Sequence, residues 1–413
     1  MPLNYDSTRR TAYLGYVTQA IINNLPPLFF VIFRRDYGLG IPQLGSLVLA
    51  NFIIQLVVDL LAVRYVDRIG YRPSIVFGTL TAACGLLSLG ILPQLLPDAF
   101  AALFIALTLN AIGGGLIEVL VSPIVNFLPG EAKASRMALL HSFYCWGHLA
   151  VVILTTLMLL PIGEERWWLL PLLWMAVPLT AAFLFSRVPI IEPRAADDSG
   201  PHVPVRRLLR QGGFWLMLLL MLAAGAGEQI MAQWSSFFAE AGLGVSKITG
   251  DLAGPSLFAL FMGCGRFVTG LMGTRLRLRR VLFLGGIALA GGYLLTVFAP
   301  WPALSLAGCA VAGLGVSVMW PGVTSLADER YPGGGTALFG LLAVAGDLGC
   351  AMGPWLAGLV SAAVIEAPAA CGMAAGLGFT VTDFGLRTGI LIGLVFPVLL
   401  IIGARSPEPG QRS

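Results

Sequence analysis

A single carboxylate, Glu118, stands in the apolar segment GGGLIEVLVSP at residues 113–123. A charged side chain at the centre of a bilayer costs about 2.5–3.5 kcal/mol on insertion scales, so such residues usually face a bundle interior or an aqueous path. A carboxylate there can carry a proton in one state and accept a hydrogen bond from a hydroxyl or an amine in another. We expect Glu118 to act in solute binding and proton coupling; a structural carboxylate between helices is the alternative. The three glycines of this segment, and Pro123, which removes a backbone donor, are expected to leave room for a solute.

Other polar side chains also stand in long apolar stretches. Gln229 and Gln233 are four residues apart, on one helical face, beside Glu228 and Trp234. Amides and carboxylates suit the hydroxyls of a sugar, and an aromatic ring suits its apolar face. The alternative is that the amides join neighbouring helices and the tryptophans anchor the membrane interface. The candidate residues for substrate binding and coupling are Glu118, Glu228, Gln229, Gln233, Trp234, Asn24, Gln55, Asn126, Trp320 and His141.

A second set of charged residues is expected to gate or to pack rather than to bind solute. Asp59 lies eight residues before Asp67, on one helical stripe, and it aligns with Arg266 when the two halves of the chain are compared. Asp347 falls in the middle of another apolar stretch. The candidate gating residues are Asp59, Asp67, Arg68, Arg72, Arg266 and Asp347.

Signatures of metal sites and enzymes do not occur in the sequence. The six cysteines have no CxxC spacing, and His141 and His148 are seven residues apart without further ligands. GxSxG, HExxH and GxxxxGK[ST] are not found, so we expect neither an enzyme nor an ATP-driven pump. Transport would then run on an ion or solute gradient, or downhill, with no cofactor or metal.

Composition defines the elements that position these residues. Hydrophobic residues make up 57% of the 413 positions and charged residues only 11%, against about 25% charged in soluble domains. A transmembrane helix needs about 20 apolar residues. The sequence therefore predicts an all-α membrane protein with twelve transmembrane helices and no sizeable soluble domain. These helices are expected near 11–33, 43–65, 73–94, 99–128, 135–160, 167–186, 213–241, 251–273, 279–298, 302–327, 335–362 and 385–404.

The predicted helices divide into two related halves. Residues 188–212, rich in Pro, Gly, Asp and Arg, are expected to be a cytoplasmic linker between six-helix bundles at 1–187 and 213–413. Pro123 aligns with Pro321 when the fourth and tenth helices are superposed. Repeats related by an axis along the membrane normal mark one large class of secondary transporter.

The basic residues indicate topology rather than a nucleic-acid partner. Most of the 25 lysines and arginines fall on the side of the two termini, which places the N- and C-termini in the cytoplasm. We expect a multi-pass protein of the bacterial inner membrane, a monomer, whose partners are the lipid bilayer and a small-molecule substrate.

The loop between the second and third helices, Asp67-Arg68-x-Gly70-x-Arg72, resembles the loop signature of the major facilitator superfamily. Val63 and Tyr71 depart from that signature. With the six-plus-six helices, the resemblance covers the whole chain. It implies that helices 1, 4, 7 and 10 line a central cavity and that Asp67 and Arg68 latch the halves on the cytoplasmic side.

The fourth helix and the motif HSFYCWG at 141–147 look like the fucose permease and sodium-dependent glucose transporter branch. This resemblance implies a role for Glu118 in proton coupling or sugar binding. Fucose permeases carry an aspartate shortly after an Asn-Asn pair, whereas here Asn23-Asn24 is followed by no carboxylate. We expect a sugar symporter driven by protons, with sodium as the alternative ion. A drug or metabolite/proton antiporter remains the alternative function.

Overall fold

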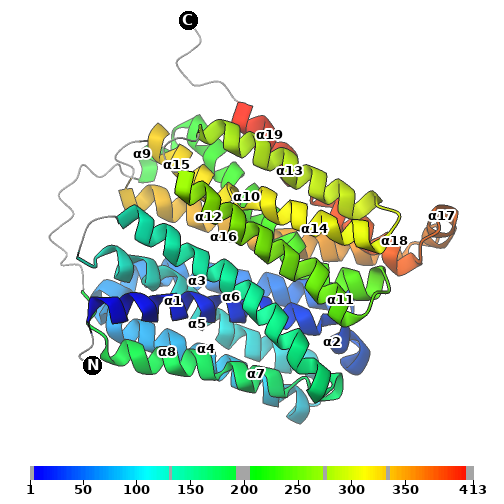
Figure 1. Ribbon diagram of the computed structural model, residues 1–413, viewed down its shortest axis with the longest axis horizontal. Helices are drawn as coiled ribbons and strands as arrows, with labels where there is room; N and C mark the ends of the chain where they lie inside the picture. Colours follow the sequence, from blue (N-terminus) through cyan, green and yellow to red (C-terminus); the bar gives the residue numbers. More distant parts are fainter. Residues whose placement is uncertain (1–3, 130–132, 192–204, 273–276, 332–334, 406–413) are drawn as a thin grey trace, which may run out of the picture. The chain divides into compact units, whose positions relative to one another are not determined.

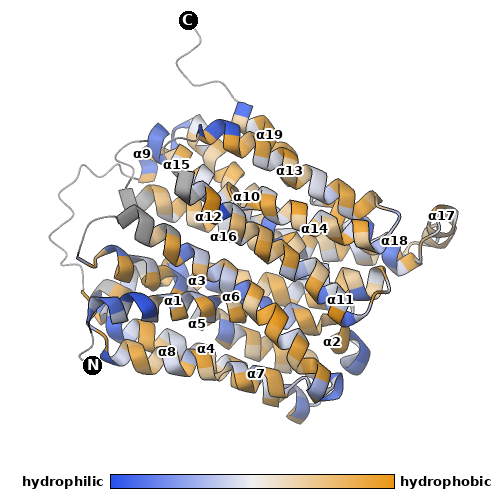
Figure 2. Cartoon of the chain, viewed as in Figure 1, coloured by the Kyte–Doolittle hydropathy of each residue, from blue (hydrophilic) through white to orange (hydrophobic). Residues whose placement is uncertain are grey.

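The protein is described by a computed structural model covering residues 4–129, 133–191, 205–272, 277–331 and 335–405. Within these ranges the regular structure is helical, and 12 helices are long and apolar enough to cross a membrane. They run from Tyr5–Tyr37 to Val381–Arg405 and coincide with the twelve predicted stretches. The predicted all-α membrane fold is confirmed. Figure 2 shows hydrophobic residues along most of the helix lengths.

The chain forms two compact units, Met1–Asp197 and Asp198–Ser413, each described by itself. The predicted linker 188–212 falls largely on residues 192–204, outside the described ranges. In Figure 1 the first unit is coloured from blue at the N-terminus to green. Its elements are α1 (Tyr5–Asn24), η1 (Pro26–Phe29), α2 (Phe30–Tyr37), α3 (Ile41–Ile69), α4 (Tyr71–Leu95), α5 (Ala99–Asn126), α6 (Lys133–Ile162), η2 (Glu164–Arg166), α7 (Leu169–Trp174) and α8 (Ala176–Arg187).

The first membrane span is interrupted by two prolines. Pro26 and Pro27 lack a backbone N–H, so the α-helix ends at Asn24 and a 3-10 turn carries the chain into α2. The span ends at Gly38, which takes a left-handed conformation with a φ of 66°. The polar residues of α1 therefore lie before this break in the span.

Glycines let α5 approach three neighbouring helices. A Cβ on Gly113 would lie 2.6 Å from the backbone nitrogen of Ala82 on α4. On Gly114 it would lie 2.9 Å from Oε1 of Gln19 on α1, and on Gly115 2.9 Å from Oδ1 of Asp59 on α3. The space beside these glycines, which we expected a solute to occupy, is filled by helix packing and by polar side chains.

The second unit contains two π-helical turns. In η4, Pro255 removes a backbone donor, which interrupts the regular α-helical ladder between α11 and α12. The elements of this unit are α9 (Val205–Leu209), α10 (Gly212–Phe237), η3 (Phe238–Gly242), α11 (Lys247–Asp251), η4 (Leu252–Ser256), α12 (Leu257–Met272), α13 (Leu278–Phe298), α14 (Pro302–Val316), α15 (Met319–Arg330), α16 (Gly335–Glu366), α17 (Ala370–Leu377), α18 (Val381–Ile392) and α19 (Val395–Arg405).

Candidate functional site

A hydrogen-bonded set of side chains joins three helices of the first unit. Nε2 of Gln19 on α1 donates to Oε1 of Gln55 on α3 at 2.8 Å and to Oε2 of Glu118 on α5 at 3.0 Å. Gln19 and Gln55 are buried and Glu118 is half-buried. The amide of Gln19 therefore holds the carboxylate of Glu118 in place.

The same set continues along α1 and α3. Nε2 of Gln55 donates to Oδ1 of Asn23 at 2.9 Å, and Nδ2 of Asn51 donates to the same oxygen at 3.3 Å. From Asn23 the chain of bonds runs through Gln55 and Gln19 to Glu118. Both hydrogen-bond partners of Gln19 Nε2 are acceptor oxygens, so the donor end of the Gln19 amide must point toward them. We call Gln19, Asn23, Asn51, Gln55 and Glu118 the amide cluster.

Three further candidates of the first unit have other contacts. Asn24 donates to the carbonyl of Ala20 at 2.9 Å and to the hydroxyl of Tyr144 at 3.4 Å. His141 is exposed, and its ring centroid lies 5.3 Å from that of Tyr16. Asn126 is exposed at the end of α5. Of the five candidates predicted for this unit, the amide cluster brings together only Glu118 and Gln55.

In the second unit, Glu228 forms an ion pair across two membrane helices. Nη2 of Arg266 on α12 lies 3.1 Å from Oε2 of Glu228 on α10, and the two side chains are 16% and 6% exposed. A guanidinium and a carboxylate at this depth compensate each other's charge. The structure therefore joins a residue predicted to bind solute with one predicted to gate.

The other candidates of α10 and α15 contact their own unit. Nε2 of Gln233 donates to Oε1 of Gln229 at 3.1 Å. Nε1 of Trp234, which is buried, donates to the carbonyl of Pro354 on α16 at 2.9 Å. The ring of Trp320 packs on the backbone of α16 at Gly346. The indole of Trp234 thus braces α10 against α16, a structural role that differs from both the sugar-binding plate and the interfacial anchor considered from the sequence.

The remaining predicted gating residues lie in both units. Arg72 donates to the carbonyls of Phe185, Ser186 and Val188 at 2.8–3.0 Å and so caps the C-terminal end of α8 within the first unit. Asp347 is buried in α16. Arg68 is exposed at the end of α3, and the side chain of Asp67 lies outside the described part of the structure.

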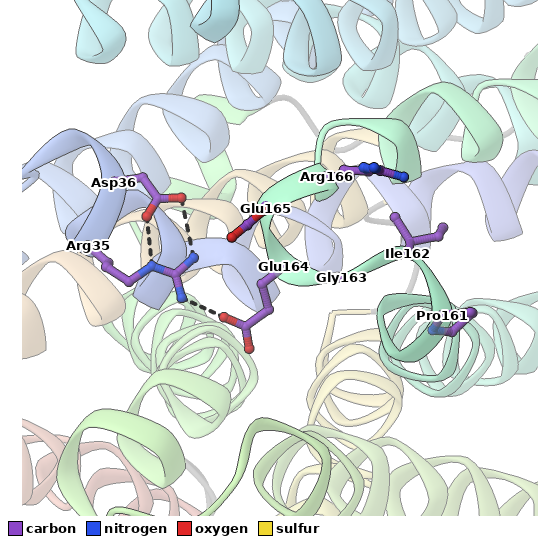
Figure 3. A pocket seen from close by; sticks show the side chains of 8 residues that line it. All are labelled: Arg35, Asp36, Pro161, Ile162, Gly163, Glu164, Glu165 and Arg166. Atoms are coloured by element: carbon purple, nitrogen blue, oxygen red, sulfur yellow. Dashed lines mark hydrogen bonds and ion pairs between the residues drawn. The ribbon is translucent and has the colours of Figure 1, made fainter.

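An open hollow of about 840 Å³ lies at one end of the first unit, lined by Arg35, Asp36 and residues 161–166 (Figure 3). Nη1 of Arg35 lies 2.6 Å from Oε2 of Glu164, and its Nε lies 2.7 Å from Oδ1 of Asp36. These side chains are 36–48% exposed, and ion pairs at such exposure contribute little to stability. None of the predicted site residues lines this hollow.

The candidate residues omitted three members of the amide cluster, Gln19, Asn23 and Asn51, and sequence reasoning also missed two buried ion pairs. Gln19 precedes Asn23 by four residues, so the helical spacing could have indicated it, as it could have linked Asn51 with Gln55. In the second unit, Lys247 pairs with Asp251 at 3.2 Å, and Arg387 pairs with Asp383 at 2.8 Å. Both are i,i+4 pairs, but they stand near helix ends, where charged residues are common.

Comparisons with known proteins agree with this architecture. A family model described as Major Facilitator Superfamily matches residues 12–354 and 255–412. Similar solved structures include a bacterial homologue of the human lysosomal transporter Spinster, inward-facing and unoccupied, at 15% identity, a TM-score of 0.75 and 97% coverage of each chain. The nucleoside transporter NupG is 13% identical with a TM-score of 0.74, covering 97% of this chain and 98% of that one. The E. coli fucose:proton symporter FucP is 17% identical with a TM-score of 0.64, and 98% of each chain is covered.

At these identities the solved structures are evidence for the fold alone. The search of curated proteins finds no match. The family model nevertheless covers nearly the whole chain, including α1, α3 and α5 of the amide cluster. The chain therefore belongs to the major facilitator superfamily: it is an integral multi-pass membrane protein and a secondary transporter of a small molecule, not an enzyme.

Proposed function

We propose that this transporter is a symporter of a small polar solute, a sugar by preference, driven by protons through Glu118. The observation that carries the proposal is the hydrogen bond from Gln19 Nε2 to Glu118 Oε2 at 3.0 Å within the amide cluster. A carboxylate that accepts a hydrogen bond from an amide can also take up a proton, and it then becomes a donor to a hydroxyl oxygen. Glu228 lies 3.1 Å from Arg266, so protonating it would remove the negative charge that this guanidinium faces.

The chemistry of the amide cluster supports a hydroxyl-bearing solute. Four amides and one carboxylate offer both donors and acceptors, and hydroxyl groups can serve as either. A site that hydrogen-bonds hydroxyls discriminates strongly against solutes without them, because its buried polar groups are then left unpaired. The similar solved structures include a fucose:proton symporter and a D-xylose-proton symporter, which agrees with this class of solute.

The test is uptake of labelled sugars into proteoliposomes with and without an imposed pH gradient. We expect the wild-type protein to accumulate at least one sugar when the gradient is imposed. Glu118→Gln keeps the shape and removes the charge, so accumulation should be lost while exchange of substrate across the membrane survives. The matched control is Glu164→Gln, which neutralises a half-exposed glutamate of the same unit.

Two outcomes would contradict the proposal. Unchanged accumulation and pH dependence in Glu118→Gln would make Glu118 a structural carboxylate. Glu228 would then be the candidate for the coupling residue. Proton-driven efflux of an organic compound, with no sugar uptake, would instead support the antiporter alternative.

A further inference from the structure

Two helices of the second unit, α13 and α19, pack against each other, and α13 begins at the end of the unit where α19 stops. A Cβ on Gly286 of α13 would lie 2.8 Å from Cγ1 of Ile401 on α19, so the helices are in close contact there. One turn nearer that end, the guanidinium of Arg405 lies over the ring of Phe283, 4.2 Å from its centroid. We call this line of contact the α13–α19 seam. Figure 2 shows the hydrophilic end of α19 beside the start of α13.

Positive charge collects at this end of the α13–α19 seam. Arg280 precedes Phe283 by three residues, so it lies on a neighbouring position of the same helical face, close to Arg405. Arg277, Arg280 and Arg405 are exposed, and none of them makes a hydrogen bond or an ion pair with another described residue. The sequences of α13 and α19 contain no aspartate or glutamate. Their guanidinium donors therefore have no carboxylate partner on either helix.

Exposed apolar side chains continue the same faces away from the arginines. On α13, Leu284 and Ile287 follow Arg280 by four and seven residues and are 54% and 46% exposed. On α19, Ile402 precedes Arg405 by three residues and is 60% exposed. Since both helices belong to membrane spans, we expect these side chains to contact the acyl chains of lipids. Each helix thus presents an arginine at one end and an apolar ridge beyond it.

We infer that this end of the α13–α19 seam binds one anionic phospholipid of the adjacent leaflet. Its phosphate accepts hydrogen bonds from Arg280 and Arg405, and its acyl chains lie along Leu284 and Ile402. A guanidinium is planar, and its N–H donors form a fork that matches two phosphate oxygens. The ring of Phe283 holds the guanidinium of Arg405 in place, so less side-chain freedom is lost when the lipid binds.

Membrane topology alone does not explain this arrangement. Basic residues orient a membrane protein wherever they stand near the end of a span. That rule requires neither a ring beneath the guanidinium of Arg405 nor two arginines on helices that touch each other. An anionic headgroup uses both features, because a single phosphate needs donors that converge on it. The inference concerns the second unit alone and is independent of the solute proposed for Glu118.

The test is native mass spectrometry of the purified full chain in a neutral detergent, titrated with phosphatidylglycerol or with phosphatidylcholine of the same acyl chains. We expect the first phosphatidylglycerol to bind about ten-fold more tightly than phosphatidylcholine, because only its headgroup carries a net negative charge. Inorganic phosphate should neither bind measurably nor displace the lipid, because it lacks acyl chains to contact the apolar ridges.

Substitutions at the α13–α19 seam identify the site. Arg280→Gln and Arg405→Gln should each weaken phosphatidylglycerol binding about five-fold, and the double variant about 25-fold. Phe283→Leu keeps both charges and should weaken binding about two- to five-fold, because the guanidinium of Arg405 loses its support. The matched control is Arg187→Gln in the first unit, where the guanidinium lies over the ring of Phe183 at 4.4 Å. This control should bind the lipid as tightly as wild type.

If a glutamine variant does not insert or fold, Arg280→Lys or Arg405→Lys replaces it, because lysine keeps the positive charge but not the planar fork. The lysine variants should still bind the lipid more weakly than wild type. Equal binding of the two lipids overturns the inference, as does unchanged binding in all variants of Arg280 and Arg405. An equal loss in Arg187→Gln would show attraction by overall charge only and would overturn it as well. Binding of inorganic phosphate as tight as that of phosphatidylglycerol would exclude the lipid as the occupant.

Discussion

Breaking the ion pair between Glu228 and Arg266 should destabilise the second unit in an asymmetric way. Removing one partner of a buried pair costs about 3–5 kcal/mol, and because Arg266 is 16% exposed we take the lower end, about 3 kcal/mol, for Glu228→Gln. Arg266→Gln should cost less, since the remaining carboxylate can take up a proton while a guanidinium keeps its charge. The double variant, in which no charge is left unpaired, should lie within about 1 kcal/mol of wild type.

The assay is the free energy of unfolding in mixed detergent micelles, measured for wild type, the two single variants and the double variant at pH 8 and pH 5. The Arg266→Gln variant should lose less stability at pH 5 than at pH 8, and Glu228→Gln should show no such recovery. Additive losses in the double variant would refute the pairing, because independent sites add whereas partners compensate. The pairing would also be refuted if the free energy of unfolding of each single variant lay within about 0.5 kcal/mol of the wild-type value.

Three further substitutions test contacts within single units. Arg72→Ala removes three hydrogen bonds to carbonyls at the end of α8 and should lower stability by about 2 kcal/mol, as measured by thermal unfolding. Gly113→Ala places a Cβ 2.6 Å from the backbone of Ala82 and should cost about 1–3 kcal/mol; unchanged stability would contradict the packing of α4 on α5. Trp234→Phe removes the bond to Pro354 and should cost about 1 kcal/mol while transport continues; loss of uptake at normal stability would show that the indole contacts the solute.

The membrane fold could be predicted because its signal is long and continuous. Each span is an apolar stretch of about 20 residues, and the bilayer requires every backbone group within it to be satisfied by helix formation. The break after Asn24 was not predicted, since the expected helix 11–33 runs through it, although Pro26 and Pro27 remove two adjacent backbone donors. Composition therefore predicts the membrane spans themselves.

The partners of the charged residues could not be read in the same way. Glu228 and Arg266 are 38 residues apart on different helices, and each alone is equally consistent with a gate, a binding site or a pair. Gln19 was missed because an uncharged amide in a helix with other polar residues gives no strong signal. The glycines before Glu118 were noticed, but their use depends on which helices lie against them, and that is decided by tertiary packing.

The first membrane span also limits how the N-terminal unit can be synthesised. In the most apolar 18-residue window of this span, Tyr5–Tyr37, 89% is buried, and Gln19 contacts a carboxylate that lies 99 residues later in the chain. At about 5–20 residues per second, a ribosome needs about 5–20 s to deliver Glu118 after Gln19 has emerged. During that interval the amide of Gln19 has its α3 partner, Gln55, but lacks the carboxylate of Glu118, at a free-energy cost. The nascent helix therefore has to be held at the insertion machinery, or shielded by α3, until α5 arrives, and chains that stop before α5 should be recognised as defective and degraded.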